Sequence, residues 1–125
     1  MKTESIAKES IEKLEWKGML FDFYGELLTE HQKKIYENAI FDDLSLSEIA
    51  TEQGISRQGV HDNLSRAEAL LRNMEEKTGC VRRDLTCRKA AQEIIIAAKQ
   101  LAEYDDPQVA SLSKKIVASA ELLGE

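Results

Sequence analysis

The sequence predicts an all-α protein, because its composition favours helices, its apolar residues recur with helical spacing, and helix-capping sequences separate the apolar runs. Its 125 residues suit one domain of ordinary size and are too few for two independent large cores. One proline and six glycines are too few for the many turns of an all-β chain. The chain is 42% apolar and 32% charged, a balance typical of a folded protein with a charged surface.

The first two helices are predicted from apolar spacing and one capping box. Between residues 20 and 28 the apolar residues follow the i, i+3, i+4, i+7, i+8 pattern of one helix face. Thr29 and Gln32 form a capping box, in which each side chain binds the other's free backbone N–H, so a second helix begins there. Its inward positions are Ile35, Tyr36, Ala39 and Ile40.

A short helix and a long helix follow. Ser45 and Glu48 form another capping box, and the short helix ends at Gly54. Ser56 is the expected N-cap of the long helix, which ends at Gly79 and is about 33 Å long. Its apolar seam comprises Val60, Leu64, Ala67, Leu71 and Met74. We expect a three-helix core to leave the far end of this seam uncovered, which favours a homodimer built from the long helix and the tail.

Residues 80–125 predict an αα-hairpin. Its first helix carries on one face Ala91, Ile94, Ile95, Ala98, Leu101 and Ala102. Asp106 caps the last helix and Pro107 opens it, because the fixed φ of proline suits the first helical position. The inward residues of that helix are Val109, Leu112, Ile116, Ala120 and Leu123. We therefore expect a domain over residues 1–79, and a hairpin over 80–125 that packs on the long helix or on a partner chain.

The segment from Leu44 to Arg72 predicts a helix-turn-helix, within residues 45–78. Two helices meet at a tight turn at Gly54, and Ala50 is small where they approach. In such a unit the second helix lays its first turns in the major groove of DNA. Arg57 suits a guanine edge and Gln58 an adenine edge. The expected nucleic-acid-binding residues are Ser56, Arg57, Gln58, His61, Asp62, Ser65 and Arg66.

The charge balance restricts how that segment can bind nucleic acid. The whole chain has a net charge of −6, and residues 45–73 have three arginines against four acidic residues. Asp62 can accept a hydrogen bond from cytosine but repels phosphate. Any nucleic-acid site must therefore be local, and a tight, generic grip on DNA is not expected. Helix-turn-helix units also occur in proteins that bind no nucleic acid, so that alternative stays open.

The residues of this segment resemble two known families. The likeness to region 4 of bacterial sigma factors, which reads the −35 promoter element, rests on Ser47-Glu48-Ile49-Ala50, Gly54-Ile55-Ser56, Val60, Leu64, Arg66-Ala67 and Leu71-Arg72. Over residues 14–80 the chain also resembles the YlxM family of small bacterial helix-turn-helix proteins. That likeness rests on Leu20-Phe21-Asp22-Phe23-Tyr24, Leu27-Leu28-Thr29, Gln32, Tyr36, Asp43-Leu44-Ser45-Leu46, Ser56-Arg57-Gln58 and Glu76-Lys77.

The resemblance to the YlxM family implies an accessory role in the signal recognition particle pathway. It places the family's Ser-Arg-Gln at residues 56–58 and its Phe-Asp-Phe-Tyr at residues 21–24. Gly59 stands where the family often has alanine, which weakens the helix by about 1 kcal/mol. The tail from Leu85 onward resembles nothing in that family pattern.

Two functions from different classes follow. In the first, the protein contacts the GTPase Ffh, the particle's RNA or both, with its acidic surface directed at the basic RNA-binding region of Ffh. In the second, it is a transcription regulator that reads promoter DNA. The residues that would read the DNA are Arg57, Gln58, His61 and Ser65.

Enzymatic, metal and membrane roles are not expected. The sequence has no glycine-rich phosphate loop, no Ser/His/Asp set and no metal-ligand spacing, so we expect no cofactor. His31 and His61 are expected on the surface, and Cys80 and Cys87 are expected to be free thiols. The charged start of the chain and the lack of a long apolar run predict a cytoplasmic protein without a membrane span.

Two further groups of side chains are open to different interpretations. Phe23 and Tyr24 are expected near the core, whereas Phe21 lies off the apolar stripe and is expected at the surface, where it would suit an interface. The basic pairs Arg82-Arg83 and Arg88-Lys89 are either solvated charge or a contact for RNA phosphates or an acidic partner.

Overall fold

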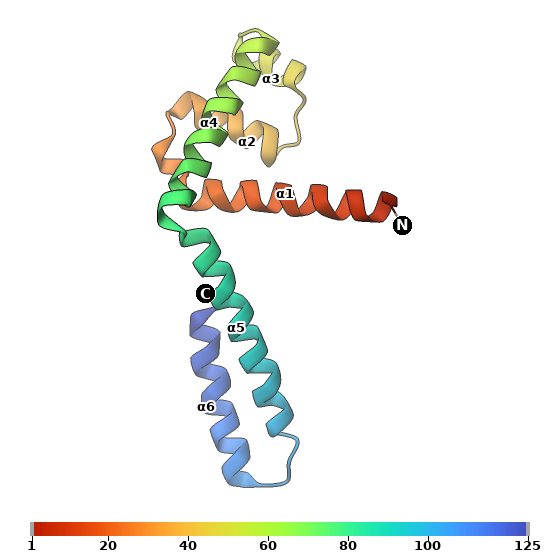
Figure 1. Cartoon of the computed structure of the whole chain (residues 1–125), viewed down its shortest axis with the longest axis vertical. Helices are drawn as coiled ribbons and strands as arrows, with labels where there is room; N and C mark the ends of the chain where they lie inside the picture. Colours follow the sequence, from red (N-terminus) through yellow and green to blue (C-terminus); the bar gives the residue numbers. More distant parts are fainter. Residues whose placement is uncertain (1, 125) are drawn as a thin grey trace. The chain divides into compact units, whose positions relative to one another are not determined.

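The computed structural model describes residues 2–124, with side chains from residue 12 to residue 124. The elements are α1 (Lys2–Tyr24), the 3₁₀ turn η1 (Gly25–Leu27), α2 (Glu30–Ile40), α3 (Leu46–Gln53), α4 (Arg57–Thr78), α5 (Cys80–Leu101) and α6 (Pro107–Leu123) (Figure 1). The described residues contain no strand, so the all-α prediction is confirmed. The chain forms two compact units, Met1–Val81 and Arg82–Glu125, and each is described by itself.

The helix boundaries follow from local capping chemistry. The predicted capping boxes at Thr29 and Ser45 are both formed. Ser56 caps α4, where its hydroxyl accepts a hydrogen bond from the Gly59 N–H at 3.0 Å. Gly79 ends α4 with φ +64°, a left-handed conformation that glycine adopts without steric cost. The predicted extents of α2, α3 and α4 are thus confirmed.

The prediction of one helix over residues 20–28 was wrong. The α-helix ends at Tyr24, and the backbone passes through η1 to an extended Leu28. Gly25 weakens the helix at this point. It is buried, and a Cβ on it would lie 3.2 Å from the Phe21 ring. As a result Leu28 is buried but Leu27 is 52% exposed.

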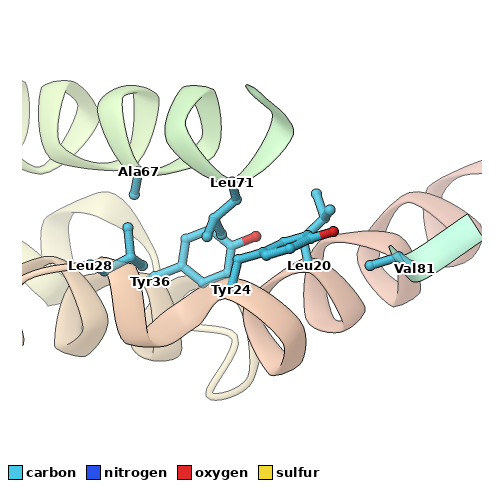
Figure 2. Packing of buried hydrophobic residues seen from close by; sticks show 7 residues of the cluster. All are labelled: Leu20, Tyr24, Leu28, Tyr36, Ala67, Leu71 and Val81. Carbon is cyan, nitrogen blue, oxygen red and sulfur yellow. The ribbon is translucent and has the colours of Figure 1, made fainter. Parts of the chain in front are cut away.

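The principal apolar cluster lies where α4 packs over α1 and α2. Its buried members are Leu20, Tyr24, Leu28, Tyr36, Ala67, Leu71 and Val81. Figure 2 shows Ala67 and Leu71 pointing from α4 toward the rings of Tyr36 and Tyr24. Tyr36 is fully buried, and its hydroxyl donates to the carbonyl oxygen of Lys17 at 2.9 Å. Residues of three helices therefore pack together around one buried aromatic residue, Tyr36.

The aromatic residues of α1 face differently from the prediction. Phe21 packs against this cluster and stacks on Tyr36 with a ring-centroid distance of 5.4 Å. Phe23, expected near the core, is 40% exposed. The expectations for Phe21 and Phe23 were therefore wrong, because α1 crosses its neighbours with Leu20, Phe21 and Tyr24 turned inward.

The far end of the α4 seam is covered within the chain. Leu71 is fully buried in the same cluster as Leu20 and Tyr24 of α1. The expectation that this end needs a partner chain was wrong, because Leu20 and Tyr24 of α1 and Val81 at the start of α5 are buried in one cluster with Leu71. A seam covered in this way gives no argument for a dimer.

The hairpin unit buries mainly small residues between its two helices. Those with almost no exposed surface are Ala91, Ala98, Ser113 and Ala120. The Ser113 hydroxyl donates to the carbonyl oxygen of Ala98, which links α6 to α5. Asp106 caps α6 and Pro107 follows it, as predicted. Small side chains let the two helices approach closely, and this leaves most large apolar residues of the hairpin exposed.

The buried Tyr36 hydroxyl predicts a loss of stability at alkaline pH. Burial raises the pKa of Tyr36 well above its ordinary value, and the nearby negative charge of Glu68 adds to the shift. Between pH 10 and the raised value the unfolded chain has lost this proton while the folded chain keeps it. The free energy of unfolding should therefore fall above pH 10, by up to about 1.4 kcal/mol per pH unit for each such group.

Urea unfolding at pH 9, 10 and 11 measures this slope. The free energy of unfolding of Tyr36→Phe should fall less steeply with pH than that of the unmodified protein, because phenylalanine has no proton to lose. Equal slopes for the two proteins would exclude Tyr36 as a source of the alkaline instability.

Candidate nucleic-acid interface

A tight turn joins α3 to α4, and the turn and the two helices together form the helix-turn-helix. Gly54 adopts φ +67°, and the N–H of Ile55 donates to the carbonyl oxygen of Ala50 at 3.1 Å. The two helices close over a second cluster of buried residues, which comprises Ile35, Ile49, Ala50 and Val60. Because α2 also contributes to this cluster, the turn and the start of α4 rest on a three-helix support.

The structure places the predicted site residues together at the start of α4. All seven are exposed: Ser56, Arg57, Gln58, His61, Asp62, Ser65 and Arg66. Val60 and Ala67 take the buried side of the same helix. The first turns of α4 therefore present a polar surface that is free to meet a ligand.

Asp62 lies at the centre of this surface. Its Oδ1 accepts a hydrogen bond from Gln58 Nε2 at 3.0 Å and lies 3.7 Å from His61 Nδ1. A charged His61 would therefore form an ion pair with Asp62. Sequence reasoning missed this arrangement, although the i, i+4 spacing of Gln58 and Asp62 could have predicted the hydrogen bond. One N–H of the Gln58 amide is held by Asp62, and the second N–H of the same nitrogen can donate to a base.

The two arginines of the site project from opposite sides of α4. Arg57 and Arg66 are nine residues apart, which is about two and a half helical turns. Gln58, His61 and Ser65 lie between them on the solvent face. A helix with a cation on each side and polar side chains between them matches a major groove, whose two phosphate backbones flank the base edges.

The structure explains why glycine suits position 59. A Cβ there would lie 3.2 Å from the Ser56 hydroxyl oxygen, closer than an ordinary van der Waals contact. The same hydroxyl caps α4 through the Gly59 N–H. The absence of a side chain therefore leaves room for the N-cap, which offsets part of the low helix propensity of glycine.

The basic side chains at the start of α5 already make contacts within the chain. Arg88 Nε lies 2.8 Å from Asp84 Oδ2, one helical turn earlier. Arg82 and Arg83 are exposed and also make contacts. These residues therefore offer less available charge to a phosphate than their number in the sequence indicates.

Other kinds of site are not evident in the described part of the chain. Among residues whose side chains are described, no three His, Cys, Asp or Glu residues are grouped so that they could hold a metal ion. His31 and His61 are both exposed, as predicted. None of the described helices combines the length and the apolar character that a membrane crossing requires.

Comparison with known proteins identifies relatives across most of the chain. Residues 11–110 match the family model "UPF0122: Putative helix-turn-helix protein, YlxM / p13 like". A UPF0122 protein of Thermoanaerobacter sp. (strain X514) is 39% identical over 106 residues, which cover 84% of this chain and 91% of the relative. Another, from Bacillus cereus (strain AH187), is 37% identical over 113 residues, covering 90% and 98%. A third, from Acetivibrio thermocellus, is 45% identical over 84 residues, covering 67% and 72%.

The family match extends the likeness beyond residues 14–80. It reaches residue 110, so it includes all of α5 and the first turn of α6. The prediction that the tail from Leu85 onward lies outside the family pattern was therefore wrong for residues 85–110.

Proposed function

This chain belongs to the UPF0122 family of helix-turn-helix proteins, and on that basis we propose that it is a regulatory protein that binds nucleic acid through the first turns of α4. The observation that carries the proposal is the exposure of all seven polar residues there, on a helix whose opposite side is buried.

The arrangement of the side chains supports one role for the two arginines and another for the polar residues between them. Arg57 and Arg66 contact phosphates on the two sides of α4, while Gln58, His61 and Ser65 face the base edges between them. Asp62 limits the affinity, because its charge repels nearby phosphates and its carboxylate holds Gln58. The protein is therefore a selective binder with modest affinity rather than a general DNA-coating protein.

We further propose a cytoplasmic role in the signal recognition particle pathway, with the GTPase Ffh, the particle's RNA or both as partners. The resemblance to the YlxM family supports the pathway. The net charge of −6 supports a protein partner with a basic surface, since an acidic chain is attracted to it at long range. The runner-up is a transcription regulator that reads promoter DNA; in that function Arg57 reads a guanine edge beside Gln58 instead of contacting a phosphate.

Replacing Arg57 with alanine should weaken nucleic-acid binding about tenfold. The slope of the logarithm of the binding constant against the logarithm of the salt concentration should become shallower by about one unit, the contribution of one phosphate contact. Arg72→Ala is the matched control, because Arg72 is also an exposed arginine of α4 but lies about 22 Å farther along the helix. The measurement is fluorescence anisotropy with the particle's RNA and with a random DNA pool, each over a series of salt concentrations.

The same assay, extended to Ffh, separates the two functions. Preferential binding of the particle's RNA or of Ffh supports the accessory role, and selection of one DNA sequence from the random pool supports the transcription regulator. If neither nucleic acid binds, or if Arg57→Ala binds as tightly as Arg72→Ala, the proposed α4 interface is wrong.

The hairpin unit supports a second proposal, a homodimer formed by one apolar face of α5 and α6. Ile94, Leu112, Ile116 and Leu123 line a groove of about 350 Å³. The exposed fractions of these four side chains range from 40% to 60%. Two helices that bury mainly alanines between them have little core of their own, and pairing two such faces would complete a four-helix bundle.

The charge substitution Ile116→Glu should convert this dimer to a monomer, because it would place a carboxylate inside the apolar interface. Ile96→Glu is the control, since Ile96 is exposed but lies on another side of α5. Light scattering after gel filtration measures the mass of each variant. A monomeric parent protein, or dissociation by both substitutions alike, would contradict the proposed face.

A further inference from the structure

An open groove of about 420 Å³ lies between α1 and the end of α2, within the unit Met1–Val81. Its apolar lining comprises Leu14, Met19, Ile40 and Phe41, and its charged lining comprises Glu15 and Asp22. We propose that this groove docks a basic amphipathic helix of a partner protein. The proposal does not depend on the α4 interface, because no residue of α4 lines the groove among the side chains described.

The apolar floor of the groove is exposed and preformed. Leu14 is 49% exposed and Phe41 is 52% exposed. The Phe41 ring packs edge-on against Phe21 at 5.5 Å, and Phe21 stacks on the buried Tyr36. An exposed aromatic ring held by this stack needs little reordering to receive a ligand, which favours binding.

At Gly18 the backbone of α1 comes close to the ring of Phe41 in the lining of the groove. A Cβ on Gly18 would lie 3.5 Å from the nearest carbon of the Phe41 ring. That distance is an ordinary van der Waals contact, so the Phe41 ring lies close to the backbone of α1. A helix laid in the groove could reach Phe41 and the surface of α1 together.

The charge of the rim identifies the kind of partner. Glu15 and Asp22 are both exposed and are seven residues apart on α1, so they lie on one side of the helix at a separation of about 10 Å. The exposed Asp42 and Asp43 directly follow Phe41 in the chain. None of the described side chains that line the groove is basic, and Lys17 of α1 pairs instead with Glu68 at 3.1 Å.

A basic amphipathic helix matches both the apolar residues on the floor of the groove and the acidic residues on its rim. The groove extends for about two helical turns along α1, from Leu14 to Asp22, which suits anchors at positions i, i+3 or i+4, and i+7 of a docked helix. Lysine or arginine residues beside those anchors would face Glu15 and Asp22. Nucleic acid would be repelled by the same carboxylates.

The test uses a fluorescein-labelled synthetic peptide of about 18 residues, with leucines at the anchor positions and arginines on both flanks. Anisotropy titrations with the full chain measure its dissociation constant. The double variant Glu15→Lys with Asp22→Lys should weaken binding about tenfold. The control is Glu93→Lys with Glu121→Lys, which changes the net charge equally at two exposed positions of the hairpin unit and should change binding less than about twofold.

A second variant and a second peptide test the floor and the charge separately. Leu14→Gln should weaken binding severalfold without any change of charge, because it removes an apolar contact. A peptide with glutamates in place of its arginines should bind at least about tenfold more weakly than the basic one. Circular dichroism melting checks that each variant is folded. Equal binding of the two peptides, or equal weakening by the groove and hairpin double variants, would overturn the proposal.

Discussion

Replacing Tyr36 with alanine should lower the free energy of unfolding of the unit Met1–Val81 by about 3–5 kcal/mol. The side chain is fully buried, it stacks on Phe21, and its hydroxyl donates to the backbone of α1. The substitution leaves a large cavity among α1, α2 and α4 and removes the hydrogen bond from the Tyr36 hydroxyl to the Lys17 carbonyl oxygen. Trp16, the single tryptophan of the chain, lies beside this cluster and reports unfolding of this unit in urea.

Tyr36→Phe is the control for this prediction. It keeps the ring stacked on Phe21 and removes only the hydroxyl, so the expected loss is about 1 kcal/mol. A loss of less than about 1 kcal/mol for Tyr36→Ala would contradict the central place of Tyr36 in the core.

Replacing Glu75 with alanine should cost about 3 kcal/mol, because it leaves two buried donors without this acceptor. Glu75 is only 2% exposed. Its Oε1 accepts from the Tyr24 hydroxyl at 2.7 Å and from the Val81 N–H at 2.9 Å, so one carboxylate links α4 to α1 and to the first turn of α5. Burial raises the pKa of Tyr24, and the charge of Glu75 adds to this shift, so Tyr24 stays protonated as the donor.

Two variants separate this role from a general effect of removing a glutamate. Glu75→Gln keeps an oxygen acceptor and should cost about 1 kcal/mol. Glu76→Ala removes an exposed neighbour and should change the free energy of unfolding by no more than about 0.5 kcal/mol. Urea unfolding followed by Trp16 fluorescence measures all three variants. Equal losses for the substitutions at positions 75 and 76 would contradict the linking role of Glu75.

Local chemistry made the helix boundaries predictable. The capping boxes at Thr29 and Ser45, the N-cap at Ser56 and the glycines at 54 and 79 act within a few residues of themselves. Such interactions depend little on the rest of the fold. They therefore appear in the structure where the sequence pattern places them.

Tertiary packing decided the features that the sequence pattern missed. The periodicity of residues 20–28 could not reveal that the chain leaves the helix at Gly25, which turned Leu27 outward. Nor could it show how α1 crosses its neighbours, which places Phe21, rather than Phe23, against Tyr36. In the hairpin, periodicity found the apolar faces. It could not show that alanines would lie inside and leucines outside, because that depends on how closely the two helices approach.

The candidate site was predictable in its exposure but not in its internal contacts. Helical periodicity correctly placed the solvent face of α4 opposite Val60 and Ala67. The hydrogen bond between Gln58 and Asp62 depends on side-chain conformations that spacing allows but does not require. The buried Glu75 did leave a signal, since it lies four residues after Leu71 and continues the apolar seam of α4.

The account depends most on the first turns of α4 being the surface that meets nucleic acid. A titration of ¹⁵N-labelled protein with the tightest-binding RNA or DNA, followed by NMR, tests this residue by residue. The prediction is that the backbone amide signals of residues 56–66 shift most, while those of the hairpin unit stay in place. Binding that leaves residues 56–66 unshifted and perturbs another surface instead would contradict it.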